Sequence, residues 1–176
     1  LLLGLRDWPY REYAAFLPEA EAEAIKARFE AEVMAALEAL ARRIPELVIL
    51  PLPMCTNHFG DDDRFYYRKL FEGERLAACL DTRLLGQELA PNDYLAEFLK
   101  AHCALTMRFH ASVFALGCGL PAVALDYTLG QGKVAAIAQR FGMPCVDLRN
   151  VQAVSLAEAL YEQLQNGPFT APLPTF

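Results

Sequence analysis

Apolar and polar positions alternate along the chain in blocks that predict strands and helices in turn. Between short apolar runs lie longer stretches in which apolar residues recur every three or four positions, as they do on one face of a helix. Continuous apolar runs of this length are typical of strands buried on both faces of a parallel sheet. The runs lie at residues 1–5, 47–50, 102–107, 122–125 and 144–146.

The clearest helix is predicted over residues 18–44. Pro18 and the acidic residues that follow it suit a first turn, and Arg42 and Arg43 suit a last turn that Pro45 ends. One apolar stripe runs along it, formed by Ile25, Phe29, Val33, Leu37, Leu40 and Ile44.

Weaker patterns predict the other elements. They are a helix from the Asp61–Asp63 cap to Phe71, a short strand at 76–80, a helix capped by Asn92, a helix from residue 108 to Gly117, a helix from Lys133 to Phe141, and a helix capped by Ser155 that runs to Gln165.

Strands that alternate with helices require right-handed crossovers and a parallel sheet covered on both faces. The predicted fold is therefore a Rossmann-like α/β domain over residues 1–166. The tail, residues 167–176, contains three prolines and is expected to be extended.

The composition is that of a globular protein, with 55% hydrophobic and 22% charged residues. No apolar run approaches the roughly 18 residues of a membrane span, so the protein is not expected to cross a membrane. The net charge of −6 argues against a general nucleic-acid surface, which concentrates Lys and Arg. An anionic small molecule remains possible, because a few placed arginines can bind one inside an acidic protein.

The five cysteines show no metal-binding or redox spacing. Cys103 and Cys145 lie in apolar runs, where a thiol behaves as a small hydrophobe. We therefore expect a reduced, cytoplasmic protein without a disulfide framework.

The main candidate chemistry lies where the 102–107 strand ends and a helix begins. A guanidinium at this corner, that of Arg108, can clamp a phosphate or carboxylate beside the free N–H groups of the helix, or it can form a structural salt bridge. His110 follows two residues later, and an imidazole can move protons near neutral pH.

Other strand ends should meet the same sheet edge. Asp126 and Tyr127 end the 122–125 run, and Lys133 follows a glycine-containing turn that lacks the Ser or Thr of a phosphate loop. Arg6 follows the first run, and its alternative role is to pair with Asp7 or another nearby acid.

His58 and Asp61–Asp63 could suggest a metal site. Adjacent carboxylates cannot all point the same way, and no second histidine has ligand spacing. Helix capping and solvation explain the acidic run better, so no metal is expected.

An ordered set of motifs then stands out. It comprises Met107-Arg-Phe-His-Ala111, Gly119-Leu-Pro121 before a strand, Asp126-Tyr127 followed by Lys133, and Gly4-Leu-Arg-Asp7. In this order the motifs resemble the polysaccharide pyruvyl transferase family, specifically its C-terminal half. The interval between Tyr127 and Lys133 is longer than is usual in that family.

The resemblance implies one half of a glycosyltransferase-B-like fold, with a further domain before Leu1. It also implies transfer of a pyruvyl group from phosphoenolpyruvate, a donor substrate rather than a cofactor, to a sugar of a glycan. In this reading His110 is the catalytic residue, Arg108 and Arg6 bind the donor, and Lys133, Tyr127 and Asp126 lie near the substrate.

Two alternatives remain open at this stage. One is a sugar-nucleotide glycosyltransferase of similar fold, although the sequence shows no convincing ribose-binding acid. The other is an isolated domain that binds a ligand without turnover.

Overall fold

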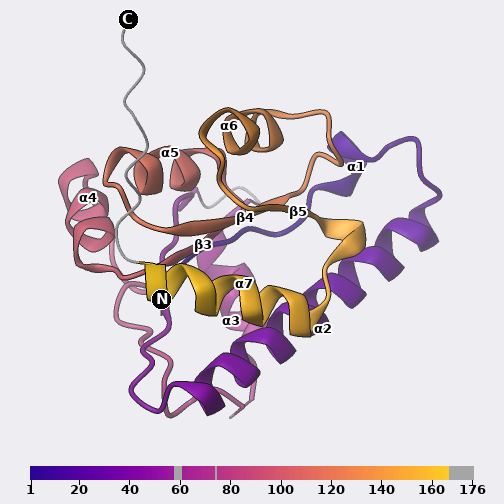
Figure 1. The fold of residues 1–176 in the computed structure, drawn as a ribbon. Helices are drawn as coiled ribbons and strands as arrows, with labels where there is room; N and C mark the ends of the chain where they lie inside the picture. Colours follow the sequence, from indigo (N-terminus) through magenta and orange to yellow (C-terminus); the bar gives the residue numbers. More distant parts are fainter. Residues whose placement is uncertain (58–60, 74, 167–176) are drawn as a thin grey trace, which may run out of the picture.

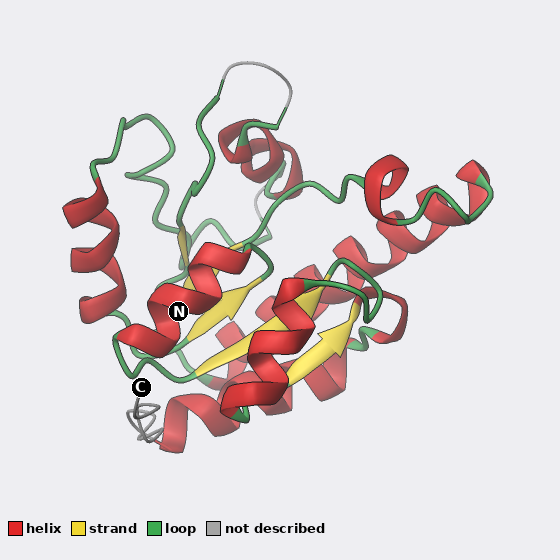
Figure 2. Cartoon of the chain, turned by 90° about the horizontal axis from the view of Figure 1, so that it is seen from above, coloured by secondary structure: helices red, strands yellow, loops and turns green. Residues whose placement is uncertain are grey.

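The computed structural model describes residues 1–57, 61–73 and 75–166. Within these residues five strands form one sheet in the order β2-β1-β3-β4-β5, and all neighbouring pairs are parallel. The strand arrows of Figure 2 accordingly point toward one edge of the sheet. The strands are β1 (Leu2–Gly4), β2 (Leu50–Pro51), β3 (Ala104–Thr106), β4 (Ala122–Asp126) and β5 (Cys145–Asp147).

Helices cover both faces of this sheet (Figure 1), which confirms the predicted Rossmann-like α/β class. On one face α2 (Glu19–Arg43) packs against α7 (Ala153–Asn166), and on the other α5 (Phe109–Gly117) packs beside α6 (Lys133–Phe141). The other helices of the described residues are α1 (Tyr10–Tyr13), α3 (Asp63–Leu70), α4 (Pro91–Lys100) and the 3-10 turn η1 (Leu148–Asn150).

The apolar stripe of α2 behaves as predicted. Phe29, Val33, Leu37 and Leu40 are all buried, and the helix uses this face against α7 and η1. Each side chain of this size contributes roughly 1.5–3 kcal/mol when it is fully removed from water. Burial of this stripe therefore holds α2 against α7 and η1.

The strand order creates a switch in direction between β1 and β3. From β1 the chain moves outward to β2, whereas from β3 it moves the opposite way to β4 and β5. Helix α2 follows β1 on one face, and α5 follows β3 on the other (Figure 1). The loops at the carboxyl ends of β1 and β3 therefore diverge, and such a switch point is where open α/β sheets bind ligands.

Two predicted helix caps were wrong. Helix α4 begins at Pro91, with Asn92 already inside it, because proline needs no hydrogen-bond partner in a first turn. Its cap contact comes from Asp93, whose carboxylate accepts from the Ala90 N–H at 2.7 Å. Helix α7 begins before Ser155, at Ala153, whose N–H is bound by Glu32 of α2 at 2.6 Å.

The strand predicted at 76–80 was also wrong. The Cys79 and Leu80 N–H groups both donate to the Leu76 carbonyl at 3.0 Å, so this segment folds on itself as a turn. Its end pairs with Ile49, through an isolated bridge to Leu80 and an Ile49 N–H that donates to the Cys79 carbonyl at 2.7 Å. Helix α3 follows its prediction more closely, and Asp62 caps it by accepting from the Arg64 N–H at 2.9 Å.

The environment of the thiols agrees with the prediction at one position and not at the other. Cys103 is buried, but Cys145 is exposed, because β5 is the edge strand of the sheet. Partial burial, with Asp126 and Asp147 nearby, nevertheless raises the pKa of Cys145 to about 11. The predicted tail at 167–176 lies outside the described residues, and none of the described helices is long and apolar enough to span a membrane.

The glycine at position 4 has no side chain, which lets α5 approach the sheet closely. A Cβ atom on Gly4 would lie 2.5 Å from the Ala111 Cβ in the first turn of α5. The Gly4 carbonyl accepts from both the Met107 and Arg108 N–H groups, at 2.9 and 3.0 Å. Gly4 therefore fixes the corner at which β3 turns into α5.

We predict that Gly4→Ala destabilises the fold by about 1–3 kcal/mol, the usual cost of overpacking a core. Urea denaturation measures this loss. Gly117→Ala at the end of α5 is the matched control, because a Cβ there meets no atom within 4 Å. It should leave stability unchanged or raise it by up to about 1 kcal/mol. Equal unfolding midpoints for Gly4→Ala and the wild type would contradict this role.

Candidate active site

Two arginines project from the two sides of the switch point. Arg6 lies two residues beyond the end of β1, and Arg108 lies two residues beyond the end of β3. Because β1 and β3 are hydrogen-bonded neighbours, the sheet brings these side chains together from positions about a hundred residues apart in sequence. The structure thus confirms that the predicted strand ends meet at one edge.

Arg108 is largely buried and paired with two carboxylates. Its side chain is 12% exposed, and its Nε and Nη2 atoms donate to Asp63 at 3.1 and 2.5 Å. Its Nη2 also donates to Asp61 Oδ1 at 3.1 Å. Burial alone would lower the pKa of Arg108, but the hydrogen bonds and charges of Asp63 and Asp61 outweigh burial and raise it. The guanidinium is therefore a fixed cation.

Arg6 meets the same acidic partner from the other side. Its side chain is 10% exposed, and Nη2 donates to Asp61 Oδ2 at 3.0 Å. The guanidinium carbon lies 5.1 Å from the ring centroid of Tyr127, within the range of a cation–π contact. Asp61 consequently links Arg6 to Arg108. Arg6 is thus paired with an acid, which was its alternative predicted role.

Asp63 is the deeply placed member of this group. Its side chain is 1% exposed, and its Oδ2 accepts from the Met54 and Cys55 N–H groups at 2.9 and 3.0 Å. Burial raises the pKa of Asp63, although the Arg108 guanidinium opposes that rise. Asp63 therefore connects the loop after β2 to the corner after β3.

The N-terminus of α5 lies beside these arginines. Arg108 is its extended cap residue, and no described side chain caps the helix. His110 lies in the first turn and is exposed, with its ring 5.7 Å from that of Phe109. Lys133, the exposed first residue of α6, places its Nζ 5.9 Å from the Phe109 ring centroid. The imidazole and the ammonium thus flank one aromatic ring.

The residues at the end of β4 divide into two roles. Asp126 is buried, and its carboxylate accepts from the Thr128 N–H and hydroxyl at 3.0 and 2.6 Å and from the Gly130 N–H at 2.5 Å. It therefore shapes the loop that leads to α6. Tyr127 packs edge-on against Tyr13 at 5.0 Å, and its carbonyl accepts from the Trp8 indole N–H at 2.8 Å.

The model of the family described as polysaccharide pyruvyl transferase matches residues 18–128, more than half of the chain. The chain belongs to the polysaccharide pyruvyl transferase family. The matched region includes Arg108 and His110, whereas Arg6 and Lys133 lie outside it. Searches of curated proteins and of solved structures gave no significant match.

The sequence interpretation of this pyruvyl transferase family member missed Asp61 and Asp63 as partners of the two candidate arginines. It assigned the whole acidic run to capping, but only Asp62 caps α3. The available signal was that two buried arginines at strand ends require acidic partners. No group of three or more metal-ligating side chains occurs among the described residues, and His58 lies outside them.

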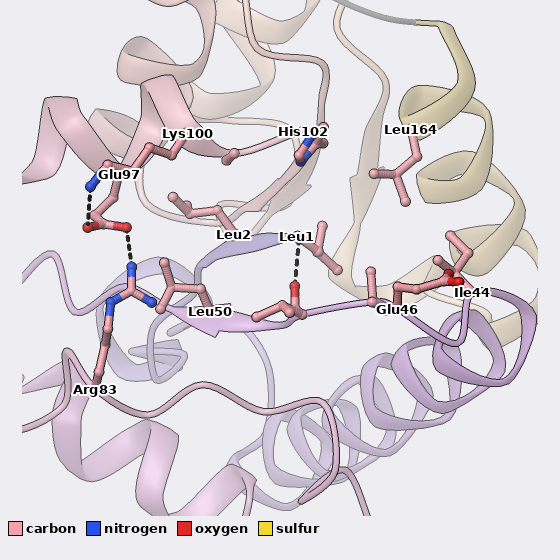
Figure 3. Close-up of a pocket in the computed structure, with 13 residues that line it drawn as sticks. Leu1, Leu2, Ile44, Glu46, Leu50, Arg83, Glu97, Lys100, His102 and Leu164 are labelled. Carbon is pink, nitrogen blue, oxygen red and sulfur yellow. Dashed lines mark hydrogen bonds and ion pairs between the residues drawn. The ribbon is translucent and has the colours of Figure 1, made fainter.

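A cavity of about 390 Å³ lies at the amino ends of the strands, opposite the carboxyl ends that carry Arg6 and Arg108. Leu1 and Leu2 line it together with His102, Lys100 and Leu164 (Figure 3). Leu1, Leu2 and His102 precede or begin the strands β1 and β3, whereas Arg6 and Arg108 follow these strands. The cavity is therefore not part of the candidate active site.

A buried tyrosine holds the chain that leads to Arg6. The hydroxyl of Tyr67 in α3 donates to the Leu3 carbonyl at 2.6 Å and accepts from the Leu5 N–H at 2.7 Å. Tyr67 is fully buried. It therefore satisfies the backbone where β1 and β2 separate.

We predict that Tyr67→Phe lowers the free energy of unfolding by about 1–3 kcal/mol, because it leaves buried backbone groups without a partner. Tyr94→Phe is the control. The Tyr94 hydroxyl donates to the Pro53 carbonyl at 3.0 Å in a partly exposed place where water can substitute. Urea denaturation should show a smaller loss for Tyr94→Phe, and equal losses would contradict the role given to Tyr67.

Proposed function

We propose that this member of the family uses phosphoenolpyruvate as donor and transfers its pyruvyl group to two hydroxyls of a glycan. The observation that carries the proposal is the convergence of Arg6 and Arg108 at the switch point, beside the N-terminus of α5. Guanidinium forks and helix N–H groups are suited to the carboxylate and phosphate of such a donor.

The reaction requires a proton transfer and two additions to one carbon. Protonation of the donor methylene makes a methyl group and leaves a cation at C2, which one sugar hydroxyl attacks with loss of its proton. A second hydroxyl then attacks C2, the bond from C2 to the phosphate oxygen breaks, and phosphate leaves with the second proton. The product is a pyruvyl ketal, and no separate cofactor is invoked.

In this proposal each residue has a distinct task. Arg108 and Arg6 bind the donor anion, and His110 supplies or accepts the proton. Lys133 adds positive charge from the start of α6, 5.9 Å from the ring that also meets His110. Tyr127 supports Arg6 through its ring, and Asp126 keeps the neighbouring loop in shape.

The direct test is to titrate the protein with phosphoenolpyruvate by calorimetry. A panel of glycans is then added, and phosphate release and the ketal methyl signal are followed. Donor binding and ketal formation together are expected. The absence of both donor binding and phosphate release with every acceptor would overturn the proposal.

Arg108→Ala should weaken phosphoenolpyruvate binding about 10- to 100-fold, because charge-assisted hydrogen bonds are worth roughly 1.5–3 kcal/mol each. Arg108→Lys should lose less, since it retains the charge but not the fork. Arg42→Ala, on the exposed end of α2, is the control and should bind normally. An unchanged Kd in Arg108→Ala would remove this residue from the donor site.

His110→Ala should lower turnover roughly 10²- to 10⁴-fold, the usual contribution of a general acid or base. Donor affinity should change little, because His110 is assigned to the proton transfer. His102→Ala is the matched control, since His102 is exposed at the opposite edge of the sheet. Normal turnover in His110→Ala would contradict the assignment.

A further inference from the structure

The two carboxylates that meet Arg108 differ in how firmly they are held. Asp63 is 1% exposed and is fixed by two backbone N–H groups, whereas the side chain of Asp61 is 41% exposed. Asp61 contacts the guanidiniums of Arg6 and Arg108 but caps no helix. Asp63 is therefore a structural anchor, and Asp61 can return to water at little cost.

The position of Asp61 is the one that a bound anion would need. One of its oxygens accepts from Arg108 Nη2 at 3.1 Å, and the other accepts from Arg6 Nη2 at 3.0 Å and Arg108 Nη1 at 3.4 Å. A single planar carboxylate thus bridges both forks. Arg6 Nη2 and both Nη atoms of Arg108 are therefore already used in the free protein.

The charges of this group also cancel. Two guanidiniums face two carboxylates. The arginines follow β1 and β3, and the carboxylates come from the start of α3 and the residue before its cap. A ligand with several negative charges gains little from a site whose net charge is zero. It gains much more when one carboxylate leaves, since the remaining site then carries a net positive charge.

We propose that Asp61 occupies the donor's anion position in the free protein, is displaced when the donor binds, and thereby sets the apparent affinity of the site. The inference rests on the proposed function of the site. It follows that Asp61 reduces the apparent affinity for every anion by the fraction of time it occupies the fork. An anion that engages both arginines with a carboxylate and a phosphate displaces Asp61, whereas a small monocarboxylate does so poorly.

The experiment compares anion binding by four forms of the protein at about 150 mM salt, where long-range charge effects are screened. Calorimetry with phosphoenolpyruvate and with pyruvate is run on the wild type, Asp61→Asn, Asp63→Asn and Asp7→Asn. Asp7 is the matched control, because its exposed carboxylate adjoins Arg6 in sequence but pairs with Lys26. Far-UV circular dichroism and urea denaturation establish that each variant is folded.

Asp61→Asn should tighten phosphoenolpyruvate binding about fivefold or more. It should tighten pyruvate binding by a similar factor, because either anion has to displace Asp61 from the same fork. Asp63→Asn should weaken binding about tenfold, because Arg108 loses its anchor. Asp7→Asn should change either affinity less than twofold.

Failure of the inference differs from failure of the proposed function. If the wild type binds phosphoenolpyruvate and Arg108→Ala does not, but Asp61→Asn binds no better than the wild type, the function stands and the role of Asp61 is wrong. Equal tightening by Asp7→Asn also overturns that role. If neither the wild type nor any variant binds the donor, the proposed function falls, and the inference falls with it.

Discussion

The close approach of α5 to β1 at Gly4 is the constraint on which the site depends. Because Gly4 has no Cβ, Ala111 can pack against the strand, and the Gly4 carbonyl can hold the first residues of the corner after β3. Arg108 then emerges beside Arg6 instead of being held away by an intervening side chain. The contact between Gly4 and Ala111 lies where the neighbouring strands β1 and β3 meet at the switch point. This packing detail therefore determines which two arginines come to lie side by side.

The fold could be predicted largely from the sequence, because its signals are local. The stripe of Phe29, Val33 and Leu37 reports one buried face of α2, and the apolar runs report strands covered on both sides. The errors arose where another part of the molecule decides the outcome. Helix α7 begins at Ala153 because Glu32 binds its N–H, and residues 76–80 turn on themselves although their composition suits a strand.

The site was predictable only in part. Arg108 and His110 stand out because they follow a strand and begin a helix, and that position carries meaning in any α/β sheet. The pairing of Arg108 with Asp63 spans 45 residues and depends on how the loop after β2 folds back. No periodicity encodes such a contact. An acidic run beside a helix start therefore looked like capping, although two of its three members face the arginines.

The hydrogen bond from the Trp8 indole to the Tyr127 carbonyl makes the two sides of the candidate site unequal. It ties the segment after β1 to the segment after β4, across the end of β3 and over 119 residues of sequence. The side of the site that carries Arg6, Trp8 and Tyr127 is thus held together, because moving one of the two segments requires moving the other. On the opposite side, Asp61 meets Arg6 and Arg108 through ion pairs that water or a ligand can replace. In the proposed displacement, the rearrangement therefore falls on Asp61, while the segments joined by Trp8 and Tyr127 keep their positions.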